Sequence, residues 1–294
     1  MNAPLAKEMH EPKSVDEAIA LLQEKGKEAA LIAGGTDLVI KLKEGVIEPI
    51  ALVDILKLPL NYIKGSRVRG FQIGATTSAK EIGNSSLLKK ELPLLVDAAI
   101  HLGGPQTQEV ATIGGNICNA SPCANFTNVL VALEASVKIQ SPEGERVTLL
   151  KDFSRGPGVT ELDASEIMTE IQIPGIEDPY GTSYVKHTLR KEMDIAIVGV
   201  AVLVLPDGNR VRKIRIALGS VGATVLLAEN AQRVMQGQVF TPHLVETAGR
   251  LAAEKDASYI DDVRSSATYR KIITDKAVKR AVEKAWTMAK GGKK

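Results

Sequence analysis

A pair of glycines directly after a short apolar run constrains the fold of this chain more than any other feature. The apolar run AALIA at residues 29–33 is followed by GGTD and then by LVIKLKEG at residues 38–45, where apolar side chains recur at helical spacing. A second apolar run, PIALVDI at residues 49–55, is typical of a strand. A capping box at residues 14–17 indicates an earlier helix that ends at Gly26. Residues 14–55 are therefore predicted to form a helix followed by a strand–loop–helix–strand unit.

The loop Gly34-Gly35-Thr36-Asp37 has the composition of an anion-binding loop. Glycine lets a phosphate approach the backbone closely and adopts positive φ at little cost, so successive N–H groups can turn toward one anion. Thr36 adds a hydroxyl donor. The same sequence is also compatible with a plain strand-to-helix turn that binds nothing, so this loop alone does not decide the function.

Residues 112–116, TIGGN, repeat the glycine pair later in the chain, and we interpret them as a second loop of the same kind. Two such loops indicate a clamp that holds a diphosphate from two sides. Neither loop has the spacing G-x-G-x-x-G or G-x-x-x-x-G-K-[ST]. The sequence therefore disfavours both a Rossmann dinucleotide site and a P-loop nucleotide site.

Both cysteines of the chain, Cys118 and Cys123, follow the second glycine pair. A structural zinc site needs four ligands and an iron–sulfur cluster usually needs four thiolates, and only His101 and His187 are even remote additional candidates. A redox pair is disfavoured because the C-x-x-C spacing is missing. We therefore expect the cysteines to be packing residues and predict neither a metal site nor a catalytic residue.

Charge and hydropathy exclude several classes of partner. The formal net charge is only +2, and aromatic residues make up 3% of the chain. Neither value favours binding to nucleic acid or to an anionic membrane. The apolar run at residues 195–205 is too short for a membrane span, and the N-terminal sequence lacks the apolar core of a secretory signal. A soluble, cytoplasmic protein is the expectation.

The middle of the chain is predicted to mix short strands and helices. Strands are expected at residues 68–75 and 136–140, with a hairpin partner at 146–150, and an edge-like strand at 166–174. Helices are expected at residues 76–82, 92–102 and 128–133. The stretch PGIEDPYG at residues 174–181 carries two prolines and two glycines, so it is the predicted domain boundary.

The last third of the chain has the pattern of an α+β domain. Residues 194–205 and 210–221 read as a strand hairpin around the turn sequence Pro-Asp-Gly-Asn. Helices are predicted at residues 226–236, 242–255 and 267–290. The last of these has apolar side chains near one face.

Five stretches together resemble the FAD-binding medium subunits of molybdenum hydroxylases, such as the flavin subunits of bacterial xanthine and carbon monoxide dehydrogenases. The stretches are AGGTDL, TIGGNICNASPCAN, EIMTEIQIP, YVKHTLRKEMDIAIV and RSSATYRKIIT. The resemblance covers essentially the whole chain and implies an α+β fold. It implies a two-part FAD-binding domain of the vanillyl-alcohol-oxidase / p-cresol-methylhydroxylase type at residues 1–57 and 58–176. A smaller C-terminal α+β domain at residues 180–290 would follow.

The resemblance also implies which residues contact a non-covalently bound FAD. The first glycine segment would wrap the pyrophosphate, the second would hold its other side and the ribityl chain, and Ile167 and Met168 would contact the flavin. Lys186 would reach the isoalloxazine, where an ammonium stabilises the negative charge of the reduced ring. The implied set is Leu31, Ile32, Ala33, Gly34, Gly35, Thr36, Asp37, Leu38, Gly103, Ala111, Thr112, Gly115, Asn116, Cys118, Asn119, Ala124, Asn125, Ile167, Met168 and Lys186.

One residue departs from the family pattern, which usually has aspartate where this chain has Asn125. Asparagine keeps an acceptor oxygen but loses the charge, so FAD affinity or potential is expected to differ. The acidic pair Asp261 and Asp262 is interpreted as a loop or helix cap and not as an acid–base dyad.

The implied function is that of an FAD-dependent oxidoreductase subunit in a hetero-oligomer. An iron–sulfur subunit would deliver electrons from a large subunit that binds a molybdenum cofactor, and FAD would pass them to an acceptor such as NAD. A stand-alone FAD oxidoreductase acting on a small organic substrate is the alternative. A third possibility is an assembly or nucleotide-binding protein that has lost FAD, which the intact glycine segments argue against.

Overall fold

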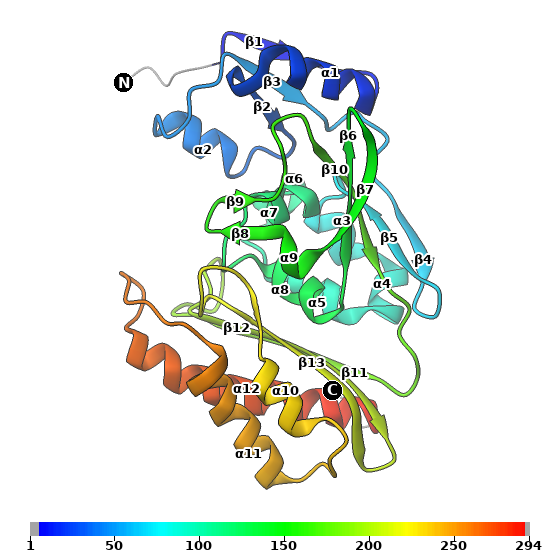
Figure 1. The fold of residues 1–294 in the computed structure, drawn as a ribbon, viewed down its shortest axis with the longest axis vertical. Coiled ribbons are helices and arrows are strands. Elements are labelled where there is room, and N and C mark those ends of the chain that lie inside the picture. Colours follow the sequence, from blue (N-terminus) through cyan, green and yellow to red (C-terminus); the bar gives the residue numbers. More distant parts are fainter. Residues whose placement is uncertain (1–5, 292–294) are drawn as a thin grey trace.

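The computed structural model describes residues 6–291 and arranges them in three units along one long axis (Figure 1). The first unit has a parallel three-stranded sheet with the order β1-β3-β2. Its elements are β1 (Glu8–His10), α1 (Val15–Lys25), β2 (Ala29–Ile32), α2 (Leu38–Lys43) and β3 (Ala51–Asp54). The predicted helix cap and stop are confirmed, since Ser14 accepts a hydrogen bond from the Glu17 N–H and Gly26 caps the other end with φ of 56°. A short 3₁₀ turn follows at Gly26–Glu28.

The second unit has a five-stranded antiparallel sheet with the order β4-β5-β10-β6-β7. Its strands are β4 (Ile63–Ser66), β5 (Gly70–Gly74), β6 (Ser136–Ser141), β7 (Gly144–Leu149) and β10 (Ile167–Ile173). Its helices are α3 (Ala79–Asn84), α4 (Ser86–Glu91), α5 (Pro93–Ile100), α6 (Pro105–Val110), α7 (Ile113–Cys118), α8 (Asn125–Ala132) and α9 (Leu150–Phe153). The small hairpin of β8 (Ser154–Gly156) and β9 (Val159–Thr160) lies beside them.

Several predicted elements of this unit need correction. The strand expected at 166–174 is not an edge strand, because β10 lies in the centre of the sheet between β5 and β6. The strand expected at 68–75 is the second half of a hairpin, β4–β5, with a turn before Gly70. The helix expected at 76–82 begins at Ala79, because Ser78 and Glu81 form a capping box there.

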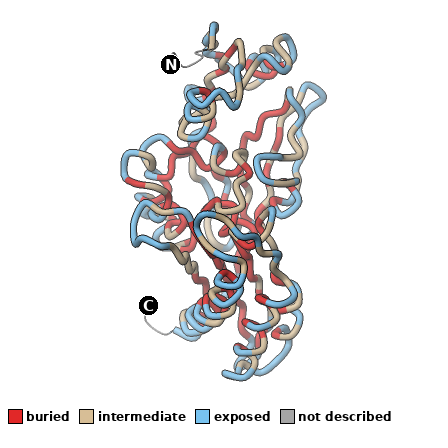
Figure 2. The backbone as a smooth tube through the Cα atoms, turned by 90° about the vertical axis from the view of Figure 1, so that its left-hand side faces the viewer, coloured by how far each residue is buried: buried red, intermediate tan, exposed pale blue. Residues whose placement is uncertain are grey.

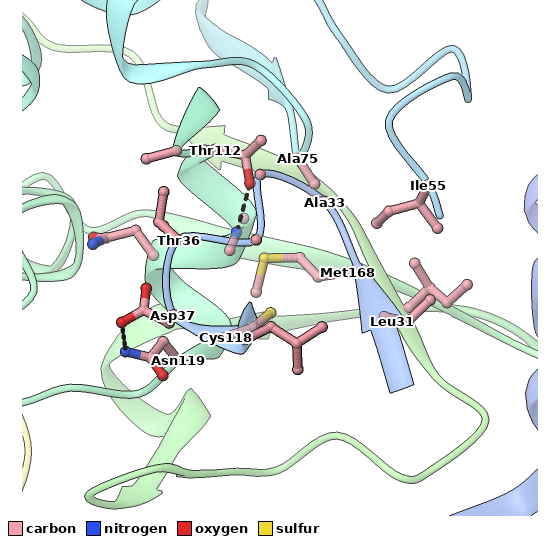
Figure 3. A pocket seen from close by; sticks show the side chains of 18 of the residues that line it. Leu31, Ala33, Thr36, Asp37, Ile55, Ala75, Thr112, Cys118, Asn119 and Met168 are labelled. Atoms are coloured by element: carbon pink, nitrogen blue, oxygen red, sulfur yellow. Dashed lines mark hydrogen bonds between the residues drawn. The ribbon is translucent and has the colours of Figure 1, made fainter. Parts of the chain in front are cut away.

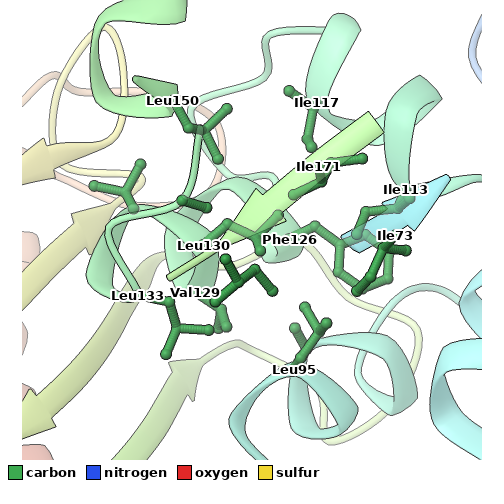
Figure 4. Close-up of a cluster of buried hydrophobic side chains, with 14 of the residues drawn as sticks. Ile73, Leu95, Ile113, Ile117, Phe126, Val129, Leu130, Leu133, Leu150 and Ile171 are labelled. Carbon is green, nitrogen blue, oxygen red and sulfur yellow. The ribbon is translucent and has the colours of Figure 1, made fainter. Parts of the chain in front are cut away.

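The core of the second unit is an apolar cluster that α5, α7 and α8 press against the sheet (Figure 4). Phe126 and Leu130 of α8 are fully buried, and they face Ile117 of α7 and Ile171 of β10. Deeply buried leucine, isoleucine and phenylalanine side chains each stabilise a fold by roughly 1.5–3 kcal/mol. This cluster therefore packs α7, which carries the second glycine pair, against the five-stranded sheet.

The third unit is a four-stranded antiparallel sheet with three helices on one face. The predicted hairpin is confirmed around the turn between the two long strands. The structure corrects the helix predicted at 226–236, whose first residues form a short strand instead. The elements are β11 (Gly181–His187), β12 (Val198–Asp207), β13 (Arg210–Gly219), β14 (Leu226–Leu227), α10 (Glu229–Met235), α11 (Pro242–Leu251), the π-helical turn Ala252–Asp256 and α12 (Ala267–Ala289).

The long apolar run of β12 is explained by burial on both faces of the sheet. Val200 and Val202 pack in the cluster formed with the helices of the third unit. Ala201 and Leu203, which point the other way, belong to the core of the second unit. Figure 2 shows buried segments on both sides of this contact. The third unit is thus joined to the second through a shared apolar core.

A polar wedge accompanies this apolar contact. Asn128 of α8 is 2% exposed and lies against Gly199 and Gly219, which pair with each other across β12 and β13. A Cβ atom at Gly199 would lie 2.7 Å from Nδ2 of Asn128, and one at Gly219 would lie 3.0 Å away. Both glycines are therefore needed for the amide to enter the sheet surface.

Arg270 ties the start of α12 to the ends of two strands. Arg270 is 2% exposed, and its guanidinium donates to the carbonyl oxygens of Ile197 and Ser220 at 2.7 and 2.9 Å. It also forms an ion pair with Asp262 at 2.8 Å. Asp261 accepts from the Ala267 N–H, so the acidic pair is a loop and cap feature as predicted.

Candidate cofactor-binding site

A cavity of about 380 Å³ lies between the first and second units, and both glycine segments line it (Figure 3). Its volume falls within the range of small-molecule and cofactor sites, roughly 300–1,000 Å³. The structure thus brings together two segments that are far apart in sequence. The predicted residues that line the cavity are Leu31, Ala33, Gly34, Gly35, Thr36, Asp37, Leu38, Ala111, Thr112, Gly115, Asn116, Cys118, Asn119, Ile167 and Met168.

The first glycine segment is shaped by two different constraints. A Cβ atom at Gly34 would lie 1.8 Å from the carbonyl oxygen of Val110, so only glycine lets this loop meet the end of α6. Gly35 has φ of 67°, a conformation that favours glycine. Among the hydrogen bonds of residues 6–291, none is donated by the backbone N–H groups of residues 34–37. Because these groups border the cavity, they are available to an anion within it.

A side-chain network closes the cavity between the first and second units. Asn119, at the end of α7, donates from Nδ2 to Asp37 at 2.9 Å (Figure 3). Its Oδ1 accepts a hydrogen bond from Lys41 of α2 at 2.8 Å. One amide therefore bridges an acidic and a basic residue of the opposite wall, and both of these residues line the cavity together with the free N–H groups.

The second glycine segment differs from the prediction, because it is not a loop. Thr112 caps α7 by accepting from the Gly115 N–H at 3.0 Å, and the glycines lie in the first turn of that helix. The N–H groups of Ile113, Gly114 and Asn116 also donate within the protein, to Thr77, Ala75 and Thr112. This segment therefore offers a small-residue wall to a ligand, while the free backbone donors belong to the first segment.

Apolar side chains and one thiol form the remaining wall of the cavity. Leu31, Ile55 and Met168 point into it (Figure 3). Cys118 lines the same wall, and burial raises the pKa of its thiol to about 12. The thiol is therefore neutral at physiological pH, and both cysteines are free. Cys118 also packs against the core of the second unit, in line with the packing role expected for it.

Five predicted residues do not line this cavity. Ile32 ends β2, and Ala124 is the buried N-cap of α8. Asn125 is 5% exposed and hydrogen-bonded within the protein. Gly103 and Lys186 line a second cavity of about 310 Å³, which the loop of residues 188–194 borders.

The two cavities lie on either side of one short segment, since Leu102 lines the first and Gly103 lines the second. Lys186 donates from Nζ to the carbonyl oxygen of His101 at 2.8 Å. Burial lowers the pKa of this lysine. His187 hydrogen-bonds to Tyr269 at 3.1 Å.

Some lining residues were not predicted from the sequence. Lys41 follows Asp37 by four residues, so the helical spacing of α2 could have indicated that both face the same wall. Thr107 and Ala75 come from α6 and from the end of β5, where no local pattern points to a ligand.

Two further findings bear on the site. In the described part of the chain, no helix is long and apolar enough to cross a membrane. Residues 6–291 also contain no group of three or more His, Cys, Asp or Glu side chains placed to hold a metal ion.

Comparison with protein families defines the class of this protein. A family model described as the FAD binding domain in molybdopterin dehydrogenase matches residues 5–176. A second, described as the CO dehydrogenase flavoprotein C-terminal domain, matches residues 183–285. The chain thus has the two parts of a flavoprotein of this class, an FAD-binding part and a C-terminal part.

Individual relatives cover nearly the whole chain. The carbon monoxide dehydrogenase medium chain of Hydrogenophaga pseudoflava is 36% identical over 281 residues, which cover 95% of this chain and 96% of that one. The glyceraldehyde dehydrogenase medium chain of Sulfolobus acidocaldarius is 34% identical, with 91% and 95% covered. The xanthine dehydrogenase FAD-binding subunit of Escherichia coli O157:H7 is 29% identical, with 97% of each chain covered.

Solved structures of related proteins have the same fold as this chain. Carbon monoxide dehydrogenase from Hydrogenophaga pseudoflava superposes with a TM-score of 0.93 at 35% identity, covering 97% of this chain and 98% of that chain. Quinoline 2-oxidoreductase from Pseudomonas putida 86 gives 0.90 at 27% identity, with 99% of each chain covered. The chain belongs to the family of FAD-binding medium subunits of molybdenum hydroxylases, and FAD is its cofactor.

The geometry of the first cavity fits an FAD diphosphate. The first glycine segment supplies unoccupied N–H donors, and Lys41 adds a basic side chain to the same cavity. At Gly115 an added Cβ would meet only the Thr112 hydroxyl, at 2.8 Å, so the glycine leaves room on the opposite wall. Donors and space therefore coincide where a dianionic group would lie.

Proposed function

We propose that this chain is the electron-relay subunit of a molybdenum hydroxylase complex. It would receive electrons from an iron–sulfur subunit, which in turn drains a large subunit holding the molybdenum cofactor, and would deliver them to an acceptor such as NAD. The observation that carries the proposal is the cavity between the first and second units. It is lined by the unoccupied backbone donors of residues 34–37 and by the hydrogen-bonded side chains of Asp37, Asn119 and Lys41. We place the complex in the cytoplasm and divide the chain into domains at residues 1–57, 58–176 and 180–290.

Each wall of the cavity would make a different kind of non-covalent contact with FAD. The N–H groups of Gly34, Gly35 and Thr36 would donate to the pyrophosphate. Thr112 and Asn116 would hold its other side and the ribityl chain, for which Gly115 leaves space. Ile167 and Met168 would present an apolar surface that excludes water. Bound FAD supplies the chemistry of exchanging electrons singly or in pairs.

Lys186 is proposed to hold a positive charge at the flavin end of the site. Its ammonium group lies at the second cavity, next to the segment that also borders the first. The hydrogen bond to the His101 carbonyl fixes Nζ there. A fixed cation favours the more negative, reduced form of a neighbouring group and therefore raises its reduction potential.

A visible spectrum of the purified chain, alone and with co-purifying partners, tests the function. We expect a flavin spectrum that NADH bleaches, while an organic substrate bleaches it only when the partner subunits are present. Absence of bound flavin even after added FAD would refute the proposal. Bleaching of the isolated chain by an organic substrate would instead establish a stand-alone oxidoreductase.

The Lys186→Met variant tests the role of the lysine. We expect the FAD midpoint potential to fall by about 30–60 mV, which corresponds to losing one charge-assisted interaction of about 1.5–3 kcal/mol in a two-electron couple. Lys284→Met, which removes an exposed lysine from α12, serves as the matched control and should leave the potential unchanged. An unchanged potential in Lys186→Met would remove this role.

A further inference from the structure

A chain of polar contacts, which we call the polar seam, joins the second and third units beside Lys186. It consists of the side chains of Asn125, Tyr184 and Lys186 and the carbonyl oxygens of Ala98 and His101. These groups come from α8, from β11 and from the C-terminal end of α5. The family resemblance had suggested Asn125 as a flavin contact, but its side chain is directed into this seam.

The two carbonyl groups belong to the end of α5, where helix geometry leaves acceptors without partners. The Leu102 N–H, which would continue the helix by bonding to Ala98, bonds to Ala99 instead. Asn125 donates from Nδ2 to the Ala98 carbonyl at 3.2 Å, and Lys186 donates to the His101 carbonyl. Two side chains from other elements thus donate hydrogen bonds to carbonyl groups at the C-terminal end of α5.

Tyr184 connects these two side chains. Its hydroxyl donates to Oδ1 of Asn125 at 3.3 Å, and burial raises its pKa, so the hydroxyl is protonated and able to donate. Its ring meets the His101 ring edge to face, with centroids 6.3 Å apart. Tyr184 and Lys186 are two residues apart on β11, so their side chains point to the same face of the sheet.

The Ala98 carbonyl explains why an amide is needed at position 125. A carboxylate could accept from Tyr184, but it has no hydrogen to offer Ala98, and two oxygen acceptors would then face each other in a buried place. An amide satisfies both neighbours because it carries one acceptor and one donor group. Asparagine is thus the residue that matches both contacts.

We infer that Asn125 is a positioning residue that acts through Tyr184 to fix where Lys186 holds its charge. Through its two hydrogen bonds, Asn125 fixes the position of β11 relative to the end of α5. This position sets the distance of the Lys186 ammonium from the segment Leu102–Gly103, which lies between the two cavities. The inference rests on the proposed role of Lys186 toward FAD. It explains the asparagine at this position by the contact between the second and third units, and not by a contact with FAD.

The test is a double-mutant cycle on the FAD-loaded chain, with the midpoint potential of FAD as the readout. Tyr184→Phe removes one oxygen atom, and we expect it to lower the potential by less than Lys186→Met does. In the Lys186→Met background, Tyr184→Phe should add no further shift, because its effect passes through the lysine. Asn125→Ala should follow the same pattern.

Two matched controls isolate the seam from general damage to the contact. Tyr180→Phe removes another hydroxyl with a 3.3 Å bond, to the Glu91 carbonyl, at the start of the third unit. Asn128→Ala removes the other buried asparagine of α8. Both should leave the potential unchanged. Urea unfolding of each variant separates a loss of stability from a change in potential.

The possible outcomes are distinct. A Tyr184→Phe shift that equals that of Tyr180→Phe, while Lys186→Met lowers the potential, overturns the positioning role and leaves the function intact. An equal Tyr184→Phe shift in both backgrounds also overturns it, since the effect would bypass the lysine. No shift in Lys186→Met overturns both the role of the lysine and this inference. If Tyr184→Phe does not retain FAD, the Asn125→Ala cycle decides by the same criteria.

Discussion

Gly34 allows the first and second units to pack closely because it has no side chain. The loop after β2 meets the end of α6 so closely that the carbonyl oxygen of Val110 occupies the place of a Cβ atom. The neighbouring residues of this loop line the cavity. Glycine is therefore required here by the close approach, whereas at Gly35 it is required by the positive φ.

Replacing Gly34 by alanine should push the loop away from α6 and displace its N–H donors. We expect FAD to bind at least about tenfold more weakly, equivalent to about 1.4 kcal/mol, by fluorescence titration. Gly156→Ala is the matched control, because an added Cβ there meets nothing within 4 Å and the backbone is not in the left-handed region. Equal affinities of the two variants would contradict the role assigned to the close approach.

Asp262 should make stability depend on pH in the acid range. Burial by itself would raise its pKa, but hydrogen bonds from the Arg264 N–H and the Arg270 guanidinium outweigh burial and lower the pKa to about 2. Because the pKa in the unfolded chain is higher, about 3.9, the stabilisation is fully present above that value and is lost as the pH falls toward 2.

The measurement is urea unfolding of Asp262→Asn and the natural chain between pH 7 and pH 3. The variant should be less stable by about 2 kcal/mol at pH 7, and the difference should shrink to roughly half by pH 3. Asp207→Asn, at an exposed position near the hairpin turn, should show no such trend. A difference that stays constant over this range would argue against an ionised Asp262 as the cause.

At the scale of elements, local patterns predicted the helices and strands better than their neighbours in the sheet. The helix at α12 and the hairpin of β12 and β13 follow directly from periodicity and turn chemistry. The central place of β10 does not, because its partners β5 and β6 lie far away in sequence. Its alternating residues looked half-exposed, yet Thr169 and Glu170 are buried in the assembled sheet.

The contact of α8 with the third sheet gives a prediction at this scale. Gly199→Ala would place a Cβ atom 2.7 Å from the Asn128 amide, and we expect a loss of about 1–3 kcal/mol in the free energy of unfolding. The double variant with Asn128→Ala should recover part of this loss, because the clash is gone. The comparison uses urea unfolding of the two single variants and the double variant. Strict additivity of the two substitutions would exclude the wedge as the cause.

At the scale of the whole molecule, the sequence predicted that the two glycine segments come together, but not that they contribute different groups to the cavity. Gly34 to Asp37 and Thr112 to Asn116 were expected to act alike. The structure gives the free donors to the first and a capped helix to the second. The difference depends on Ala75 and Thr77, which accept the N–H groups of α7 and come from a strand end that no motif connects to it.

Because the cavity walls come from two units, FAD binding should stabilise their contact. We expect bound FAD to slow amide hydrogen exchange in β2 and α2 more than in β13 and α12, since a ligand stabilises the states that it binds. Hydrogen-exchange mass spectrometry with and without FAD measures this. Equal added protection of all three units would contradict this prediction, because FAD would then stabilise the molecule as a whole and not the contact between the first two units.

The Asn128 wedge also limits how freely the parts of this protein can be recombined. A hybrid chain that took its last hundred or so residues from another family member would bring foreign residues to positions 199 and 219 while keeping the amide of α8. Any side chain larger than glycine there would meet that amide. Asn128, Gly199 and Gly219 would therefore have to be exchanged together, although Asn128 lies before the boundary at which such a hybrid would be joined and the two glycines lie after it.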